Sequence, residues 1–197
     1  MEQKQLRNLS RTLTLLLRHR GREEGLEIKS NGFAKLDDLF LNNRVKKFDP
    51  TLEDIKKIVQ NDEKGRFTLV ENNGSYFLKA NQGHSIEVDQ LNLKKITDEN
   101  EIKFGIHGTN YKAWNIISKE GLKIMGRTHI HFAIDENEKA GIRKNSDIHI
   151  YLDIQKCLKD GIELFLSENN VLLSKGQNGI ILPKYFLKIV DKNEKKN

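Results

Sequence analysis

The sequence predicts an α+β fold in two lobes. Helical periodicity fills the first half of the chain and ends in a hairpin signal, whereas the second half carries many short strands. A length of 197 residues suits one domain or two small ones at roughly 100–200 residues per domain. We therefore predict lobes over 1–98 and 99–190, with the acidic segment 98–101 as linker and 191–197 as a frayed tail.

Helix signals and one hairpin signal define the first lobe. Five leucines at helical spacing predict a helix over 4–19 that ends at Gly21: Leu6, Leu9, Leu13, Leu16 and Leu17. A second helix is predicted over 35–43, and a third follows Pro50, with Thr51 and Asp54 as a capping box. Strands 66–70 and 76–80 flank the turn signal Asn72-Asn73-Gly74. Three helices followed by a hairpin indicate a winged-helix-like unit, an architecture common in nucleic-acid binding.

The second lobe is predicted to be rich in strands. Strands over 103–106 and 130–133 surround a helix over 110–120 that ends at Gly121. Apolar and polar residues alternate from Ile148 to Ile154, which predicts a half-buried strand. Further strands are predicted over 163–166, 171–174, 179–182 and 185–190.

The positive charge is concentrated at the start of the chain. The net charge is +6, and residues 1–22 alone carry six basic residues and one acidic residue, a local charge of +5. Such a local bias predicts an anionic partner, either nucleic acid or a phosphorylated ligand, and the alternative is a solvated helix end.

Three other features bound the function. The chain has no apolar run of the roughly 18–20 residues that span a bilayer, and no signal-peptide core, so we expect no membrane association. The single Cys157 excludes an intramolecular disulfide and a Cys-rich zinc site. We expect a cytoplasmic protein, or a nuclear one if the source is eukaryotic.

Five segments place cationic or histidine side chains beside a glycine or a turn. They are Leu17-Arg18-His19-Arg20, Lys64-Gly65-Arg66-Phe67, Ala80-Asn81-Gln82-Gly83-His84-Ser85, His107-Gly108-Thr109 and Met125-Gly126-Arg127-Thr128-His129-Ile130-His131. Each segment alone is consistent with surface charge or a polar turn. His129 and His131 could begin a metal site, but no cysteine or acidic pattern completes it, and we predict no metal. Neither a P-loop nor a GxGxxG motif after a strand is present.

Together and in this order, the five segments, with Gly32-Phe33 and the following Asp-Asp-Leu helix, resemble the NAD-dependent RNA 2′-phosphotransferase family. This family is often called tRNA 2′-phosphotransferase, and the resemblance covers residues 8–190. Two departures occur: Lys79 stands where many relatives have Arg, and Arg20-Gly21 replaces a frequent Lys-Pro.

The resemblance implies a winged-helix-like lobe that binds RNA and phosphate, and a lobe resembling the NAD-binding fold of ADP-ribosyltransferases. Family members remove an internal RNA 2′-phosphate, as left at tRNA splice junctions, in two steps. The phosphate first attacks NAD and releases nicotinamide, leaving an ADP-ribosylated RNA phosphate. The products are then 2′-hydroxyl RNA and ADP-ribose 1″,2″-cyclic phosphate. We expect NAD as co-substrate, RNA as partner and a monomer.

The resemblance also implies roles for individual residues. The catalytic set is Arg18, His19, Arg66 and Arg127. NAD contacts are expected from His107, Gly108, Thr109, Gly121, His131 and Arg143. Contacts with the substrate phosphate or its cleft are expected from Lys64, Gln82, Gly83, His84 and Ser85. Three guanidiniums suit a phosphate dianion, because their planar forks bind its oxygens in fixed geometry.

Two alternatives stay open. An enzyme of the same fold could stop after the first step and ADP-ribosylate terminal phosphates of RNA or DNA. The chain could also be a non-catalytic RNA-binding module.

Overall fold

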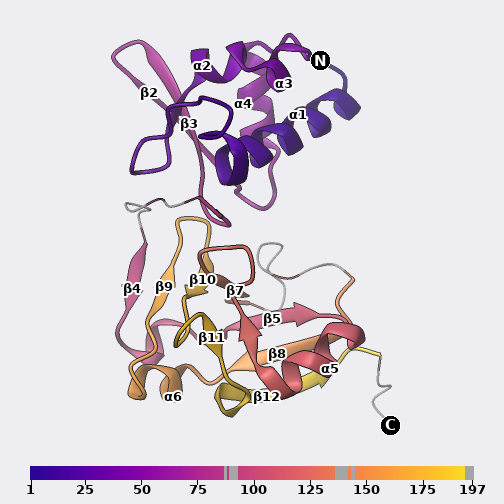
Figure 1. Ribbon diagram of the computed structural model, residues 1–197, viewed down its shortest axis with the longest axis vertical. Coiled ribbons are helices and arrows are strands. Elements are labelled where there is room, and N and C mark those ends of the chain that lie inside the picture. The colour runs from indigo at the N-terminus through magenta and orange to yellow at the C-terminus, as the bar shows by residue number, and fades with distance from the viewer. Residues whose placement is uncertain (87, 89–92, 136–141, 143–144, 194–197) are drawn as a thin grey trace. The chain divides into compact units, whose positions relative to one another are not determined.

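The computed structural model describes residues 1–86, 88, 93–135, 142 and 145–193 and shows a mixed α/β protein (Figure 1). The chain divides into two compact units, Met1–Asn92 and Leu93–Asn197. The segment 98–101, which we predicted as linker, folds as the 3₁₀ helix η2 (Glu99–Glu101) inside the second unit. No helix in the described ranges is long and apolar enough to cross a membrane.

Helical residues outnumber strand residues in the described part of the first unit. The helices are α1 (Gln3–Leu15), α2 (Leu36–Leu41), α3 (Asn43–Lys46) and α4 (Leu52–Gln60), and α1 continues into the π-helical turn η1 (Leu16–Arg20). The helix predicted over 35–43 is divided because Asn42 has an extended backbone and its side chain accepts a hydrogen bond from the Arg44 N–H at 2.9 Å. The Thr51–Asp54 capping box is confirmed, with both reciprocal bonds present.

The predicted hairpin is also confirmed. Strands β2 (Phe67–Asn72) and β3 (Ser75–Ala80) pair antiparallel, and β1 (Ala34–Lys35) adds to the other edge of β3. Asn73 and Gly74 both have positive φ, +49° and +72°, as a two-residue type I′ turn requires. Leu9, Leu13, Leu16 and Leu17 are fully buried against α2, α4 and this hairpin. The leucine stripe read from the sequence is therefore the core of the unit.

An antiparallel sheet forms the centre of the second unit. Its described strands run in the order β12-β8-β5-β7-β10-β9-β4. Their bounds are β4 (Lys94–Ile96), β5 (Ile106–Thr109), β7 (Ile130–Ala133), β8 (Ile148–Leu152), β9 (Leu164–Leu166), β10 (Val171–Ser174) and β12 (Phe186–Asp191). A separate pair joins β6 (Leu122–Lys123) and β11 (Ile180–Ile181). The remaining helices are α5 (Tyr111–Glu120), α6 (Ile154–Lys159) and the 3₁₀ turn η3 (Pro183–Tyr185).

Three expectations about this unit were wrong, the last of them in part. The strand predicted over 103–106 lies at 106–109, because these residues pair with β8 from Ile148 to Tyr151. Strand β8 is buried on both faces rather than one, since it lies between β12 and β5 with apolar clusters on each side. The start of the predicted frayed tail is held in the fold: Asp191 accepts a hydrogen bond from the Tyr111 hydroxyl at 2.7 Å, and the Lys192 N–H donates to the Asp147 carbonyl at 2.8 Å. Residues 194–197 of that tail lie outside the described residues.

Candidate active site

The first candidate cluster begins at a π-helical turn. At the end of the leucine-rich helix, the Gly21 N–H donates to the Leu16 carbonyl at 2.7 Å, an i→i−5 bond that defines this wider turn. Gly21 has a helical φ, so a positive φ does not explain the glycine. It is required because there is no room for a side chain: an added Cβ would lie 2.6 Å from Ile28 Cδ1 and 2.7 Å from the Leu16 oxygen. Single π turns are rare and occur often at functional sites. Arg18 and His19 lie inside this one.

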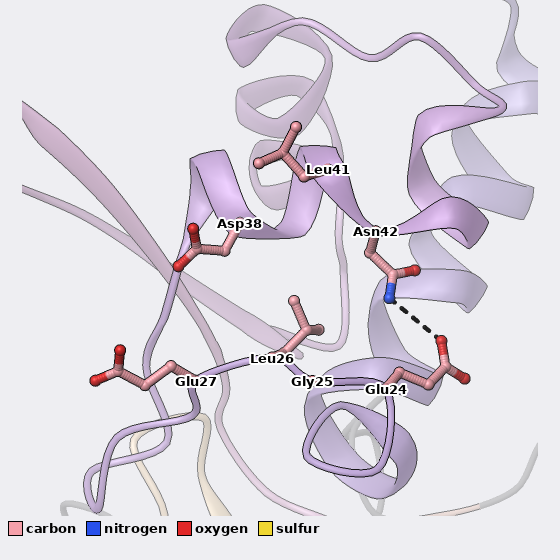
Figure 2. A pocket seen from close by; sticks show the side chains of 7 residues that line it. All are labelled: Glu24, Gly25, Leu26, Glu27, Asp38, Leu41 and Asn42. Atoms are coloured by element: carbon pink, nitrogen blue, oxygen red, sulfur yellow. Dashed lines mark hydrogen bonds between the residues drawn. The ribbon is translucent and has the colours of Figure 1, made fainter.

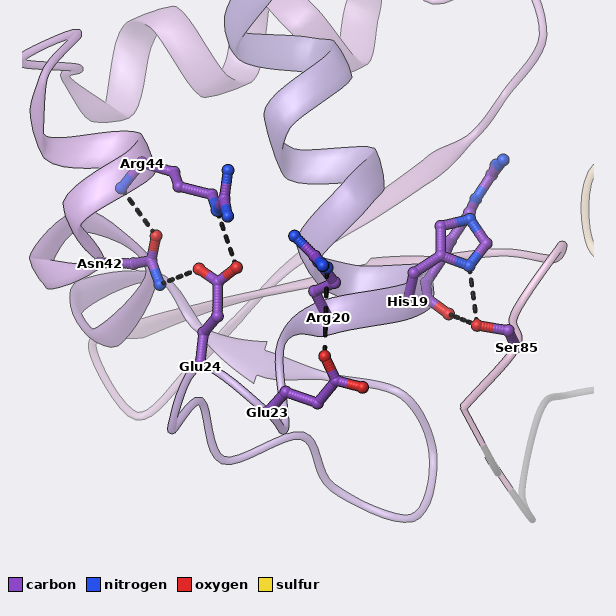
Figure 3. Close-up of polar contacts among 8 residues, drawn as sticks. His19, Arg20, Glu23, Glu24, Asn42, Arg44 and Ser85 are labelled. Atoms are coloured by element: carbon purple, nitrogen blue, oxygen red, sulfur yellow. Dashed lines mark hydrogen bonds and ion pairs between the residues drawn. The ribbon is translucent and has the colours of Figure 1, made fainter.

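The loop after β3 is attached to the π turn by hydrogen bonds. The N–H groups of Ser85 and Ile86 both donate to the Arg18 carbonyl, at 2.9 and 3.3 Å. His19 Nδ1 lies 2.9 Å from Ser85 Oγ, and Figure 3 shows the imidazole pointing toward that hydroxyl while Arg20 points toward Glu23. Two segments 66 residues apart in sequence are thus joined at His19.

Gly83 brings the same loop against Arg18. Its φ is +85°, and a Cβ built there would lie 3.2 Å from Arg18 Nη1. A side chain at position 83 would therefore press on the guanidinium, and glycine avoids both this contact and the strain of a left-handed backbone.

The loop is also attached to the turn that carries Arg66. The Asn81 N–H donates to the Arg66 carbonyl at 2.9 Å, and Asn81 Nδ2 donates to the Gly65 carbonyl at 2.8 Å. The Arg66 guanidinium and backbone N–H both donate to the carboxylate of Asp62, whose side chain is 5% exposed. The Lys64 N–H donates to the same carboxylate at 3.3 Å. Arg18, His19, Lys64 and Arg66 are therefore organised by one loop and one buried acid.

Two further predicted site residues, Gln82 and His84, lie in the same loop, and Lys79 lies just before it in β3. Gln82 is partly exposed and His84 is 1% exposed, so the two neighbours differ sharply in access to solvent. Lys79 is 3% exposed, with its ammonium 5.0 Å from the centre of the Phe33 ring. This cation–π contact contributes to the stability of a buried cation at that position.

The second candidate cluster lies on neighbouring strands of the large sheet. His107 Nδ1 is 3.0 Å from the His131 carbonyl oxygen, and a carbonyl only accepts, so Nδ1 carries a proton. The His107 ring also meets Phe132 edge to face, with centroids 5.9 Å apart. His107 and His131 are both partly exposed, and the two contacts fix the orientation of the His107 ring.

Gly108 is a position where no side chain fits. An added Cβ would lie 2.9 Å from both Ile142 Cγ2 and Ser146 Oγ. Thr109 beside it is 7% exposed, and Asn110 caps α5 by accepting from the Ala113 N–H at 2.8 Å.

The other predicted residues of this unit are more dispersed. Arg127 is exposed in the turn before β7, where its N–H donates to the Ile124 carbonyl at 3.2 Å. Gly121 ends α5 with φ +85°, and an added Cβ would lie 2.4 Å from the Ile181 oxygen. Ten helical residues, about 15 Å, separate it from Thr109, so the fold does not bring these two together. Arg143 lies outside the described residues.

Comparison with known proteins gives the chain its family. A model of the RNA 2′-phosphotransferase family, Tpt1 / KptA, matches residues 4–176. The chain belongs to this family. The resemblance inferred from the five segments is thereby confirmed, and most of both units is included in the match.

Curated proteins from eukaryotes and bacteria are similar to this RNA 2′-phosphotransferase family member. A putative tRNA 2′-phosphotransferase of Schizosaccharomyces pombe is 36% identical over 184 residues, 91% of this chain and 50% of that protein. The chain thus spans about half the length of that relative. tRNA 2′-phosphotransferase 1 of Danio rerio is 35% identical, over 90% of this chain and 82% of its own. A probable RNA 2′-phosphotransferase of Flavobacterium johnsoniae is 33% identical, over 91% and 94%.

A pocket in the first unit contains none of the residues predicted for this family's site. Its volume is about 410 Å³, and Figure 2 shows the side chains around it, with Asn42 donating to Glu24 at 3.2 Å. The lining residues are Glu24, Gly25, Leu26, Glu27, Asp38, Leu41 and Asn42. Three carboxylates make this pocket a poor place for a phosphate.

Two organising residues were not among the predicted site residues. Asp62 lies four residues before Arg66, and only the short spacing of opposite charges could have indicated it. Asn81 was quoted within the loop motif, but its contact with Gly65 depends on β2–β3 pairing, which the sequence gives only as a hairpin signal. Cys157 is fully buried, and burial raises the pKa of its thiol to about 12, so it is a core residue rather than a nucleophile.

Proposed function

We propose that this protein removes an internal 2′-phosphate from RNA by transferring it to NAD. In this proposal the first unit is a winged-helix-like lobe that holds RNA and its phosphate, and the second is an ADP-ribosyltransferase-like lobe that holds NAD. Membership of the RNA 2′-phosphotransferase family supports the reaction class. The use of NAD as phosphate acceptor is tested by the assay with 2′-phosphorylated RNA.

The observation that carries the proposal is the joining of Arg18, His19 and Arg66 by one loop. Ser85 fixes this loop to the Arg18 carbonyl, and Asn81 fixes it to the Arg66 carbonyl. A 2′-phosphomonoester is a dianion, and planar guanidiniums bind its oxygens in a fixed geometry. A non-catalytic RNA binder would need basic surface, but not guanidiniums held in place by a buried carboxylate and a glycine loop.

The second cluster presents a partly exposed imidazole in a fixed orientation. The His107 ring is oriented by the His131 carbonyl, and the missing Cβ at Gly108 lets Ile142 and Ser146 pack against the strand beside it. We assign NAD to His107, Gly108 and Thr109 because the family resemblance implies NAD contacts there and the His107 ring is accessible. NAD supplies the electrophilic ribose carbon and nicotinamide as the leaving group.

The bond changes follow from these reactants. An oxygen of the 2′-phosphate attacks C1″ of the nicotinamide-bearing ribose, and the C1″–N bond breaks as nicotinamide leaves. The 2″-hydroxyl then attacks phosphorus and loses its proton, while the RNA 2′-oxygen leaves and gains one. Negative charge develops on the phosphoryl oxygens in the second step, where Arg18 and Arg66 would stabilise it.

The deciding experiment uses a short RNA with one internal 2′-phosphate. With NAD, we expect release of nicotinamide, RNA with a free 2′-hydroxyl, and ADP-ribose 1″,2″-cyclic phosphate in the mass spectrum. Without NAD, or with RNA lacking the phosphate, no nicotinamide should appear. Recovery of intact 2′-phosphorylated RNA after incubation with NAD would refute the proposal. ADP-ribosylated RNA without the cyclic phosphate would instead identify an enzyme that stops after the first step.

A further inference from the structure

The contact between His19 and Ser85 bears on which imidazole nitrogen carries the proton. The two atoms, His19 Nδ1 and Ser85 Oγ, are 2.9 Å apart, and either could be the donor if nothing else were near. The Ser85 side chain starts from a fixed position, because its own N–H donates to the Arg18 carbonyl at 2.9 Å. The pair is visible at the helix end in Figure 3.

A third atom favours one direction. The Ser85 hydroxyl lies 3.4 Å from the Arg18 carbonyl oxygen, in a geometry where it donates to that oxygen. A carbonyl can only accept, and a serine hydroxyl has one proton to give. When Ser85 donates to this carbonyl, its Oγ offers only lone pairs to the imidazole, and the proton of the contact is then on His19 Nδ1.

We infer that Ser85 is a positioning residue that holds neutral His19 as the Nδ1–H tautomer and makes Nε2 the basic nitrogen. The role in catalysis rests on the proposed function, whereas the tautomer does not. In neutral imidazole, Nε2 then has a lone pair that can accept a proton or hydrogen bond from a ribose hydroxyl. When His19 is protonated, the same Nε2–H donates to a phosphate oxygen. One nitrogen thus serves both kinds of substrate group, according to its protonation state.

The tautomer can be measured directly on the full chain. Protein labelled with ¹⁵N-histidine is observed by long-range ¹H–¹⁵N NMR at a pH where the rings are neutral, and a His19→Gln variant assigns the His19 signals. We expect the Nδ1–H pattern for wild type and for Ser85→Thr, which keeps the hydroxyl. Ser85→Ala should change His19 toward the Nε2–H pattern, while Ser30→Ala, an exposed serine of the same unit, should leave it unchanged.

Kinetics provide a second readout. Because a general base with the wrong tautomer cannot accept the proton, Ser85→Ala should lower kcat by about tenfold or more, with rescue by Ser85→Thr and little change in KM for NAD. Wild-type His19 in the Nε2–H form, or an unchanged pattern in Ser85→Ala, would overturn the inference. An Nδ1–H pattern in a protein that releases no nicotinamide from NAD and 2′-phosphorylated RNA would refute the proposed function alone.

Discussion

At the scale of single residues, two glycines with positive φ differ in whether an added side chain would contact the candidate site. Gly83 and Gly74 have similar φ values, +85° and +72°, so a Cβ meets the same left-handed penalty at both. At Gly74 nothing lies within 4 Å of that Cβ, whereas at Gly83 the Arg18 guanidinium does. The two positions therefore form a matched pair.

We predict that Gly83→Ala and Gly74→Ala each lower the free energy of unfolding by about 1 kcal/mol. Only Gly83→Ala should also slow turnover, because its methyl group displaces Arg18. Urea denaturation and nicotinamide release at saturating NAD measure the two effects. Equal turnover in both variants would show that the position of Arg18 against Gly83 has no part in the reaction.

His129 connects pH to the stability of the second unit. Burial lowers the pKa of its imidazole from 6.5 to about 4, and the charge of Lys175 adds to the effect. Because the unfolded chain binds the proton more readily, stability is complete above pH 6.5 and is lost as pH falls toward 4. The full shift corresponds to a loss of about 3 kcal/mol.

The prediction is that unfolding by urea, followed by the fluorescence of Trp114, the single tryptophan, shows this loss between pH 7 and pH 4. In His129→Gln the pH dependence over the same interval should be weaker, since no imidazole remains to be protonated at this position. A slope as steep in the variant as in wild type would assign the effect to other groups.

At the scale of secondary structure, the sequence predicted helices, caps and the hairpin well where the signals are local. The Thr51–Asp54 box and the Asn73-Gly74 turn depend on a few adjacent residues, and both formed as expected. The π turn was not predictable, because leucine spacing is compatible with a regular helix to residue 19. Gly21 packs closely against Ile28 at this turn, with no room for a Cβ, and that packing depends on tertiary structure.

The burial of both faces of β8 was likewise not predictable from the sequence pattern. Alternation of apolar and polar residues usually marks a strand with one wet face. Here His149 and Tyr151, on the face expected to be wet, are 7% and 4% exposed, and His149 Nε2 lies 3.0 Å from Ser146 Oγ. A hydrogen bond and an apolar cluster with Phe104 and Ile106 make that face part of the interior. The alternation of apolar and polar residues in the sequence predicts neither of these contacts.

The π turn itself can be tested with Gly21→Ala. The methyl group would meet Ile28 and the Leu16 oxygen, so the turn has to shift and move the Arg18 carbonyl to which Ser85 is bonded. We expect lower stability and a lower kcat. Thr51→Ala is the control, because loss of the cap costs about 1 kcal/mol without touching the loop, and turnover of the folded protein should be retained. A similar kcat in the two variants would contradict a role for the π turn.

At the scale of the whole molecule, the basic excess of the first 22 residues has two parts. Arg20 and Arg22 are engaged within the fold: Arg20 lies 4.0 Å from the Glu23 carboxylate and Arg22 donates to the Ile28 carbonyl at 3.5 Å. Arg7 and Arg11 are exposed on α1, the helix that continues into the π turn with Arg18. Helical spacing in the sequence already predicts Arg7, Arg11 and Arg18 on one face of the helix. Arg20 and Arg22 are also exposed, but only Arg7 and Arg11 of these four lie on the helix that leads to the candidate phosphate site.

This distribution predicts a salt-dependent RNA affinity carried by α1. Each phosphate contact with single-stranded RNA contributes about 0.7 to the slope of log affinity against log salt, so Arg7→Gln with Arg11→Gln should lower that slope by roughly 1. Lys112→Gln with Lys119→Gln, two exposed lysines on α5, is the matched control, since both double variants reduce the net charge from +6 to +4. Anisotropy of a labelled 2′-phosphorylated RNA, titrated without NAD at several salt concentrations, gives the slopes. If the α5 variant changed the slope as much as the α1 variant, net charge rather than the α1 face would attract the RNA, and the interpretation of the basic N-terminal helix as a docking surface would fail.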